Sequence, residues 1–139
     1  MLQNAVSFFG FLQALYNLFS SSTHRWCILV SAIQGAVVKS LSVTRWSARS
    51  DATRALRENY SEICSALMKI RGDENQTKAT RSEASSLHSK MEQFETALLC
   101  ILWDSILHRF NATSKSLQAT HIELATCVSL YDSLVSFID

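Results

Sequence analysis

The feature that most constrains the fold of this 139-residue chain is its lack of proline, combined with only three glycines. Proline breaks helices, and glycine forms many of the tight turns that join strands. Nearly half of the residues are apolar, so a chain of this length buries a substantial core as a single domain. The sequence shows neither the period-two alternation of strands nor an internal repeat. We therefore predict an all-α fold.

Apolar residues recur at steps of three and four in five segments, which is the spacing of one helix face. The Ser20–Thr23 segment offers N-caps to the second helix, and Gly72 offers a stop to the third. β-branched residues in the second segment leave a strand as a minor alternative. We predict an irregular bundle that occupies residues 1–139 as one region, with helices at about 2–19, 24–38, 51–71, 81–114 and 121–138.

Burial follows from the same patterns. The first helix has a wide apolar stripe, so we expect more than one of its sides to be buried. The C-terminal half of the 81–114 helix is apolar nearly all round, which predicts a central position. In the last helix, the residues expected to face inward are Leu124, Val128, Tyr131, Val135 and Ile138.

Charge is distributed unevenly along the chain. The net charge is +1, which argues against a general polyanion binder. Residues 1–50 nevertheless contain Arg25, Lys39, Arg45 and Arg49 and no acid. A nucleic-acid contact would therefore lie early in the chain. The alternative is that sparse charges simply mark a buried N-terminal half.

A basic cluster with one indole lies at the end of a polar connection, residues 39–50, and continues into the next predicted helix. Arg54 and Arg57 are three residues apart and share a helix face. Trp46 could stack on an unpaired base. In the alternative interpretation Trp46 fills a gap over the core, Arg54 pairs with Glu58, and the other arginines are solvated. The candidate DNA-binding residues are Arg45, Trp46, Arg49, Arg54 and Arg57.

Catalytic and metal-binding patterns do not stand out in the sequence. No glycine-rich phosphate loop, HExxH motif or Ser-His-Asp pattern is evident, so we predict that the chain is not an enzyme and carries no cofactor. The four isolated cysteines indicate small buried side chains of an intracellular protein. His24 and Cys27 have ligand spacing, but no second pair completes a zinc site. The two apolar segments at 2–19 and 26–38 are interrupted or too short, so no membrane contact is expected.

Five segments resemble, in the same order, hAT-superfamily transposases and the domesticated proteins descended from them. These descendants include the zinc finger MYM-type proteins and the "repressor of the inhibitor of the protein kinase" group. The match to the Thr-Arg-Trp signature of the family is the closest of the five. The segments are Met1–Val6, Phe8–Ser20, Ser22–Trp26, Leu41–Arg49 and Phe110–Gln118.

The resemblance implies a fold and a location. In hAT transposases an all-α domain is inserted into an RNase H-like catalytic domain, and this chain resembles the beginning of that insertion. The Asp-Asp-Glu triad, and the divalent metal that it binds, would lie outside the chain, as would the Cys-x-x-His element and the zinc-finger domain. The resemblance therefore implies a non-catalytic fragment of a nuclear protein.

The resemblance also implies a role for the indole. In the family, the tryptophan of the Arg-Trp motif lies near the active site and helps to hold flipped-out DNA. Trp46 and its neighbour Arg45 match that motif. The leading hypothesis is a helical region that helps to position DNA, with DNA and the remainder of the transposase fold as partners. The alternatives are a helical protein–protein interaction module of a domesticated regulator, which binds through exposed apolar surface, and a non-functional remnant.

Overall fold

The computed structural model describes residues 2–33, 46–117 and 124–139, and within these ranges the secondary structure is helical with no strands. The all-α prediction is confirmed, although seven helices replace the five that the sequence predicted. They are α1 (Leu2–Ser20), α2 (Thr23–Ala32), α3 (Trp46–Glu58), α4 (Tyr60–Gly72), α5 (Lys78–Met91), α6 (Phe94–Leu117) and α7 (Leu124–Ile138).

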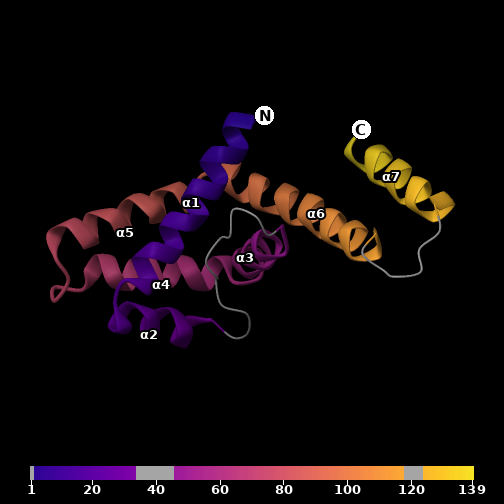
Figure 1. The fold of residues 1–139 in the computed structure, drawn as a ribbon. Helices are drawn as coiled ribbons and strands as arrows, with labels where there is room; N and C mark the ends of the chain where they lie inside the picture. The colour runs from indigo at the N-terminus through magenta and orange to yellow at the C-terminus, as the bar shows by residue number, and fades with distance from the viewer. Residues whose placement is uncertain (1, 34–45, 118–123) are drawn as a thin grey trace.

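The helices form a packed body from which one long helix extends (Figure 1). α4 and α5 pack against each other, α2 packs on α4, and α1 contacts α2, α5 and α6. α3 packs along α6. α7 packs against α6 at one end of the molecule, away from α2, α4 and α5 (Figure 1).

The main hydrophobic core lies where the first six helices meet. α1 contributes six side chains, which confirms that more than one of its sides is buried. α4 contributes Ile63, Leu67 and Ile70 at the spacing that the sequence predicted. The larger members of the core are Phe8, Phe11, Leu12, Leu15, Leu18, Phe19, Leu29, Ile33, Leu56, Ile63, Leu67, Ile70, Leu87 and Met91.

The helix predicted at 51–71 is two helices, and the first of them begins earlier than expected. α3 starts at Trp46, so part of the predicted polar connection is helical. Asn59 separates α3 from α4, and it is a buried polar residue. Its side-chain amide donates a hydrogen bond to the Ala55 carbonyl at 2.9 Å. Asparagine side chains compete in this way with the helical backbone, which explains the break.

The helix predicted at 81–114 is likewise divided. Thr77 caps α5, and its hydroxyl accepts a hydrogen bond from the backbone N–H of Thr80. Residues 92 and 93 form a turn in which the Gln93 N–H bonds to the Lys90 carbonyl at 3.2 Å. This i-to-i+3 bond tightens the chain before α6 begins. The turn contains neither glycine nor proline, which is why the sequence pattern did not reveal it.

The predicted burial of the last two helices is wrong. The C-terminal half of the predicted 81–114 helix does not lie centrally, because Leu98, Ile101 and Leu102 are exposed on α6. In α7 only Leu134 is a buried hydrophobic side chain among those described. The residues that were expected to face inward but are at least half exposed are Val128, Tyr131, Val135 and Ile138.

The second predicted helix is confirmed at its start. Ser22 is the N-cap of α2, and its hydroxyl accepts a hydrogen bond from the Arg25 N–H. The predicted extension to residue 38 lies beyond Ile33, outside the described residues. In the part of the chain that the structure describes, no helix combines the length and apolar character needed to cross a membrane.

Candidate functional site

Two of the basic residues singled out from the sequence, Arg54 and Arg57, lie on α3 at its contact with α6. One side of α3 places Ala52, Ala55 and Leu56 in the core. Arg54 and Arg57 are one helical turn apart and both reach the neighbouring helix α6. The sequence therefore predicted correctly that these two guanidinium groups share a face.

Both arginines meet the same carboxylate, Asp104 of α6. The Nη1 atom of Arg57 donates a hydrogen bond to Oδ2 of Asp104 at 2.7 Å. The Nε atom of Arg54 lies 3.6 Å from Oδ1, an oxygen that has no hydrogen bond to the described residues. The Asp104 side chain is only 5% exposed, so these charged neighbours compensate for its removal from water.

Arg54 also contacts His108, one helical turn further along α6. Its Nη2 atom lies 3.1 Å from Nδ1 of the imidazole. Since a guanidinium has no acceptor, Nδ1 must accept, which places the proton of the neutral ring on Nε2. The alternative pairing of Arg54 with Glu58 is not seen among the described contacts. We therefore define the α3–α6 charge cluster as Arg54, Arg57, Asp104 and His108.

A thiol packs beneath this cluster. Cys100 of α6 is buried, and its Sγ donates to the Thr53 carbonyl at 3.9 Å. Burial raises the pKa of Cys100 to about 12, with a further rise from Asp104 that Arg57 partly opposes. A thiol with so high a pKa stays protonated near neutral pH and is a poor nucleophile. Cys100 therefore contributes to the packing of α3 on α6.

The cluster has an excess of positive charge on its outer side. Two guanidinium groups face one carboxylate, and the side chains of Arg54 and Arg57 remain 46% and 47% exposed. Half-exposed guanidinium groups retain donors that can bind a phosphate or a carboxylate. The arrangement can hold an anion, but it offers no nucleophile with an adjacent base.

The other three candidate residues are placed differently. Arg49 lies on α3 with its guanidinium carbon 5.0 Å from the ring centre of Phe9, so it stacks on an aromatic face of α1. Arg45 lies outside the described residues. Trp46 begins α3, but the position of its side chain lies outside what the structure describes. The DNA-binding role assigned to these residues from the sequence stays a prediction.

Asp104, the residue that organises the cluster, was not among the residues predicted from the sequence. The sequence could have indicated this residue, because Asp104 is the only acid between Glu95 and the end of α6 and lies within an otherwise apolar run. A single acid on the apolar part of a helix requires a partner. Only the fold shows that α3 supplies that partner.

Within residues 2–33, 46–117 and 124–139, no three His, Cys, Asp or Glu side chains are close enough together to hold a metal ion. Comparisons of the chain with protein families, with curated proteins and with solved structures find no match.

Proposed function

We propose that this chain is a helical region of a hAT transposase-like protein and that it acts as a non-catalytic docking scaffold. In this proposal the outer faces of α6 and α7 pack against other helices of the same transposase-like fold. The all-α architecture supports the proposal, together with the five segments that resemble the family.

The observation that carries the proposal is the apolar surface of α6 and α7. Phe94 is 80% exposed at the start of α6, and the exposed apolar side chains continue along this helix and α7. Exposed apolar side chains that gather on helix faces mark interaction sites in folded proteins. We define the α6–α7 apolar surface as Phe94, Leu98, Ile101, Leu102, Val128, Tyr131, Val135 and Ile138.

The spacing of these residues fits another helix as the occupant. Val128, Tyr131, Val135 and Ile138 recur at steps of three and four, which forms a stripe along α7. An apolar stripe of this type binds a second apolar helix surface. α7 carries no basic residue and one acid within its bounds, so charge contributes little to this contact.

Two measurements test the docking role. The coding sequence on both sides of this region should contain an upstream Cys-x-x-His element and two aspartates, and a downstream glutamate. Co-expression of the chain with those flanking segments should give a complex that co-purifies. Leu102→Glu and Tyr131→Glu should abolish the complex without lowering the melting temperature, whereas Lys69→Glu, on the exposed side of α4, should change neither. A complex that survives both substitutions would contradict the role of this surface.

DNA positioning is a second candidate function, favoured by the half-exposed guanidinium groups of Arg54 and Arg57. Arg45 and Trp46 precede them in the chain and would extend the contact. A base stacked on the indole contributes about 1–3 kcal/mol. We therefore expect Trp46→Ala to weaken the binding of hairpin or single-stranded DNA roughly tenfold in fluorescence anisotropy, and Arg45→Ala to weaken it and reduce its salt dependence. If both variants bind DNA as the wild type does, the DNA role is excluded.

A further inference from the structure

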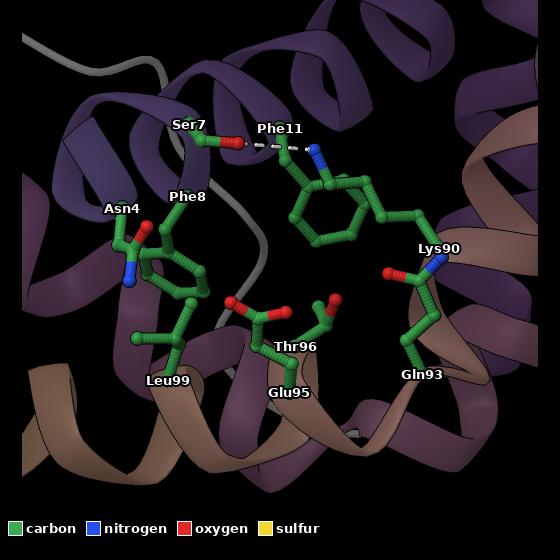
Figure 2. Close-up of a pocket in the computed structure, with 9 residues that line it drawn as sticks. All are labelled: Asn4, Ser7, Phe8, Phe11, Lys90, Gln93, Glu95, Thr96 and Leu99. Carbon is green, nitrogen blue, oxygen red and sulfur yellow. Dashed lines mark hydrogen bonds between the residues drawn. The ribbon is translucent and has the colours of Figure 1, made fainter.

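A small cavity lies between α1, the C-terminal end of α5 and the first turn of α6 (Figure 2). Its volume is about 130 Å³, close to that of an engineered cavity of about 150 Å³ that accepts benzene. Phe8 and Phe11 of α1 and Leu99 of α6 form its apolar walls. The cavity therefore suits one apolar group the size of a single side chain and is too small for a nucleotide cofactor.

Opposite charges lie on two sides of this cavity without pairing to each other. Lys90 reaches toward α1, where its ammonium group lies 3.4 Å from the Ser7 hydroxyl and 5.6 Å from the ring centre of Phe11. The Glu95 carboxylate points into the space from α6 (Figure 2). Neither Lys90 nor Glu95 takes part in an ion pair with the residues that the structure describes. Each charge is therefore available to a ligand.

The hydroxyl group of Thr96 adds a third polar group. Thr96 is only 4% exposed, and in Figure 2 its hydroxyl points into the cavity from the first turn of α6. It makes no hydrogen bond to the described residues, so it can bond a group that enters the cavity. The N-terminal turn of a helix also leaves backbone N–H donors without helical partners. The cavity thus offers polar groups that a ligand would satisfy.

These groups together select one chemical class. A simple anion would meet the Glu95 carboxylate, and a simple cation would meet the Lys90 ammonium group. A molecule that carries both charges next to an apolar group matches the charged and the apolar walls of the cavity. We propose that this cavity binds a free α-amino acid with an apolar side chain. Its carboxylate lies toward Lys90, its ammonium group toward Glu95, and its side chain against Phe8, Phe11 and Leu99.

The test uses the full chain, with L-leucine as the probe, in isothermal titration calorimetry. L-Leucinamide lacks the carboxylate and 4-methylpentanoate lacks the ammonium group, so each analogue removes one of the two charge contacts. We expect saturable one-to-one binding of L-leucine, and affinities for both analogues that are about tenfold weaker, because each loses a hydrogen bond to a charged group. The proposal is overturned if L-leucine does not bind up to its solubility limit, or if either analogue binds as tightly.

Variants assign the binding to this cavity. Lys90→Gln and Glu95→Gln should each weaken L-leucine binding about tenfold, and Thr96→Val about fivefold, while the cavity keeps its shape. Lys69→Gln and Glu83→Gln change exposed charges elsewhere and should leave the affinity unaltered. If Lys90→Gln and Glu95→Gln unfold at the wild-type temperature and still bind L-leucine with wild-type affinity, the site is not this cavity. The result does not depend on the docking role of α6 and α7.

Discussion

The helices α1 and α7 have similar compositions but very different surroundings. α1 contains no charged residue and α7 only one, and both are rich in apolar side chains. α1 lies against α2, α5 and α6 and buries six large apolar side chains, whereas α7 packs on α6 and buries only Leu134 among its described residues. Apolar composition alone therefore does not determine burial. Burial depends on how many sides of a helix pack against other helices.

The contact that α7 does make is partly polar. Arg109 of α6 donates a hydrogen bond to Ser133 of α7, and its guanidinium carbon lies 5.4 Å from the ring centre of Phe137. A cavity of about 270 Å³ remains between the two helices. Such a contact stabilises α7 less than the close packing that holds α1.

The largest expected effect comes from a core substitution in α1. Leu15→Ala removes a fully buried side chain and should lower the free energy of unfolding by about 2–5 kcal/mol. Val135→Ala, on the exposed side of α7, should change it by less than about 0.5 kcal/mol. Urea denaturation followed by far-UV circular dichroism measures both. Equal losses in the two variants would contradict the contrast between the helices.

The next prediction concerns stability at alkaline pH, which depends on two buried groups among the packed helices. Burial raises the pKa values of both Tyr60 and Cys100 to about 12 in the folded chain, from ordinary values of 10.0 and 9.0. The unfolded chain therefore loses these protons first, so stability should fall as pH rises from about 9 toward 12. Cys100→Ala should show a smaller fall in urea denaturation. A stability that is constant across this pH range would contradict the burial of both groups.

In the α3–α6 charge cluster, removal of a positive charge should lower the free energy of unfolding more than removal of the negative charge. Arg57→Gln leaves the buried Asp104 with only the longer contact to Arg54, and should cost about 1–3 kcal/mol of unfolding free energy. Asp104→Asn leaves two half-exposed guanidinium groups that water can solvate, and should cost less than about 1 kcal/mol. Thermal unfolding of both variants decides the order. A larger loss for Asp104→Asn would show that the carboxylate holds α3 in place.

The smallest expected effect is a difference in the reaction rates of the cysteine thiols, which distinguishes an exposed thiol from a buried one. Cys27 of α2 is exposed, and Cys100 is buried beneath α3. In the folded protein an aromatic disulfide reagent should therefore react quickly with Cys27 and only after unfolding with Cys100. Cys27→Ser should remove the fastest phase. Rapid reaction of all four thiols without denaturant would show that the packed body opens readily.

The sequence predicted the parts of the fold that depend on local periodicity. Ile63, Leu67 and Ile70 recur at the predicted steps of three and four and form the buried face of α4, and the N-cap of α2 lies within the predicted Ser20–Thr23 segment. The breaks between helices were missed, because Asn59 acts through a side-chain bond and residues 92 and 93 carry no turn signal. The local apolar pattern therefore does not reveal where these helices break.

The candidate site was predicted only in part for a related reason. The spacing of Arg54 and Arg57 showed that they share a face, but their partner Asp104 is 47 positions from Arg57 in the chain. Periodicity also gave the wrong burial for Val135 and Tyr131, because it shows which side of a helix is apolar and not whether anything covers that side.

Hydrogen exchange of α7 tests the docking account most directly. The backbone amides of the isolated chain should be compared by mass spectrometry with those of the same chain joined to the flanking segments to which we propose that it docks. We expect rapid exchange in α7 of the isolated chain and strong protection in the longer protein, while α1 and α4 exchange slowly in both. Exchange in α7 that is equally rapid in both proteins would contradict the docking of this surface.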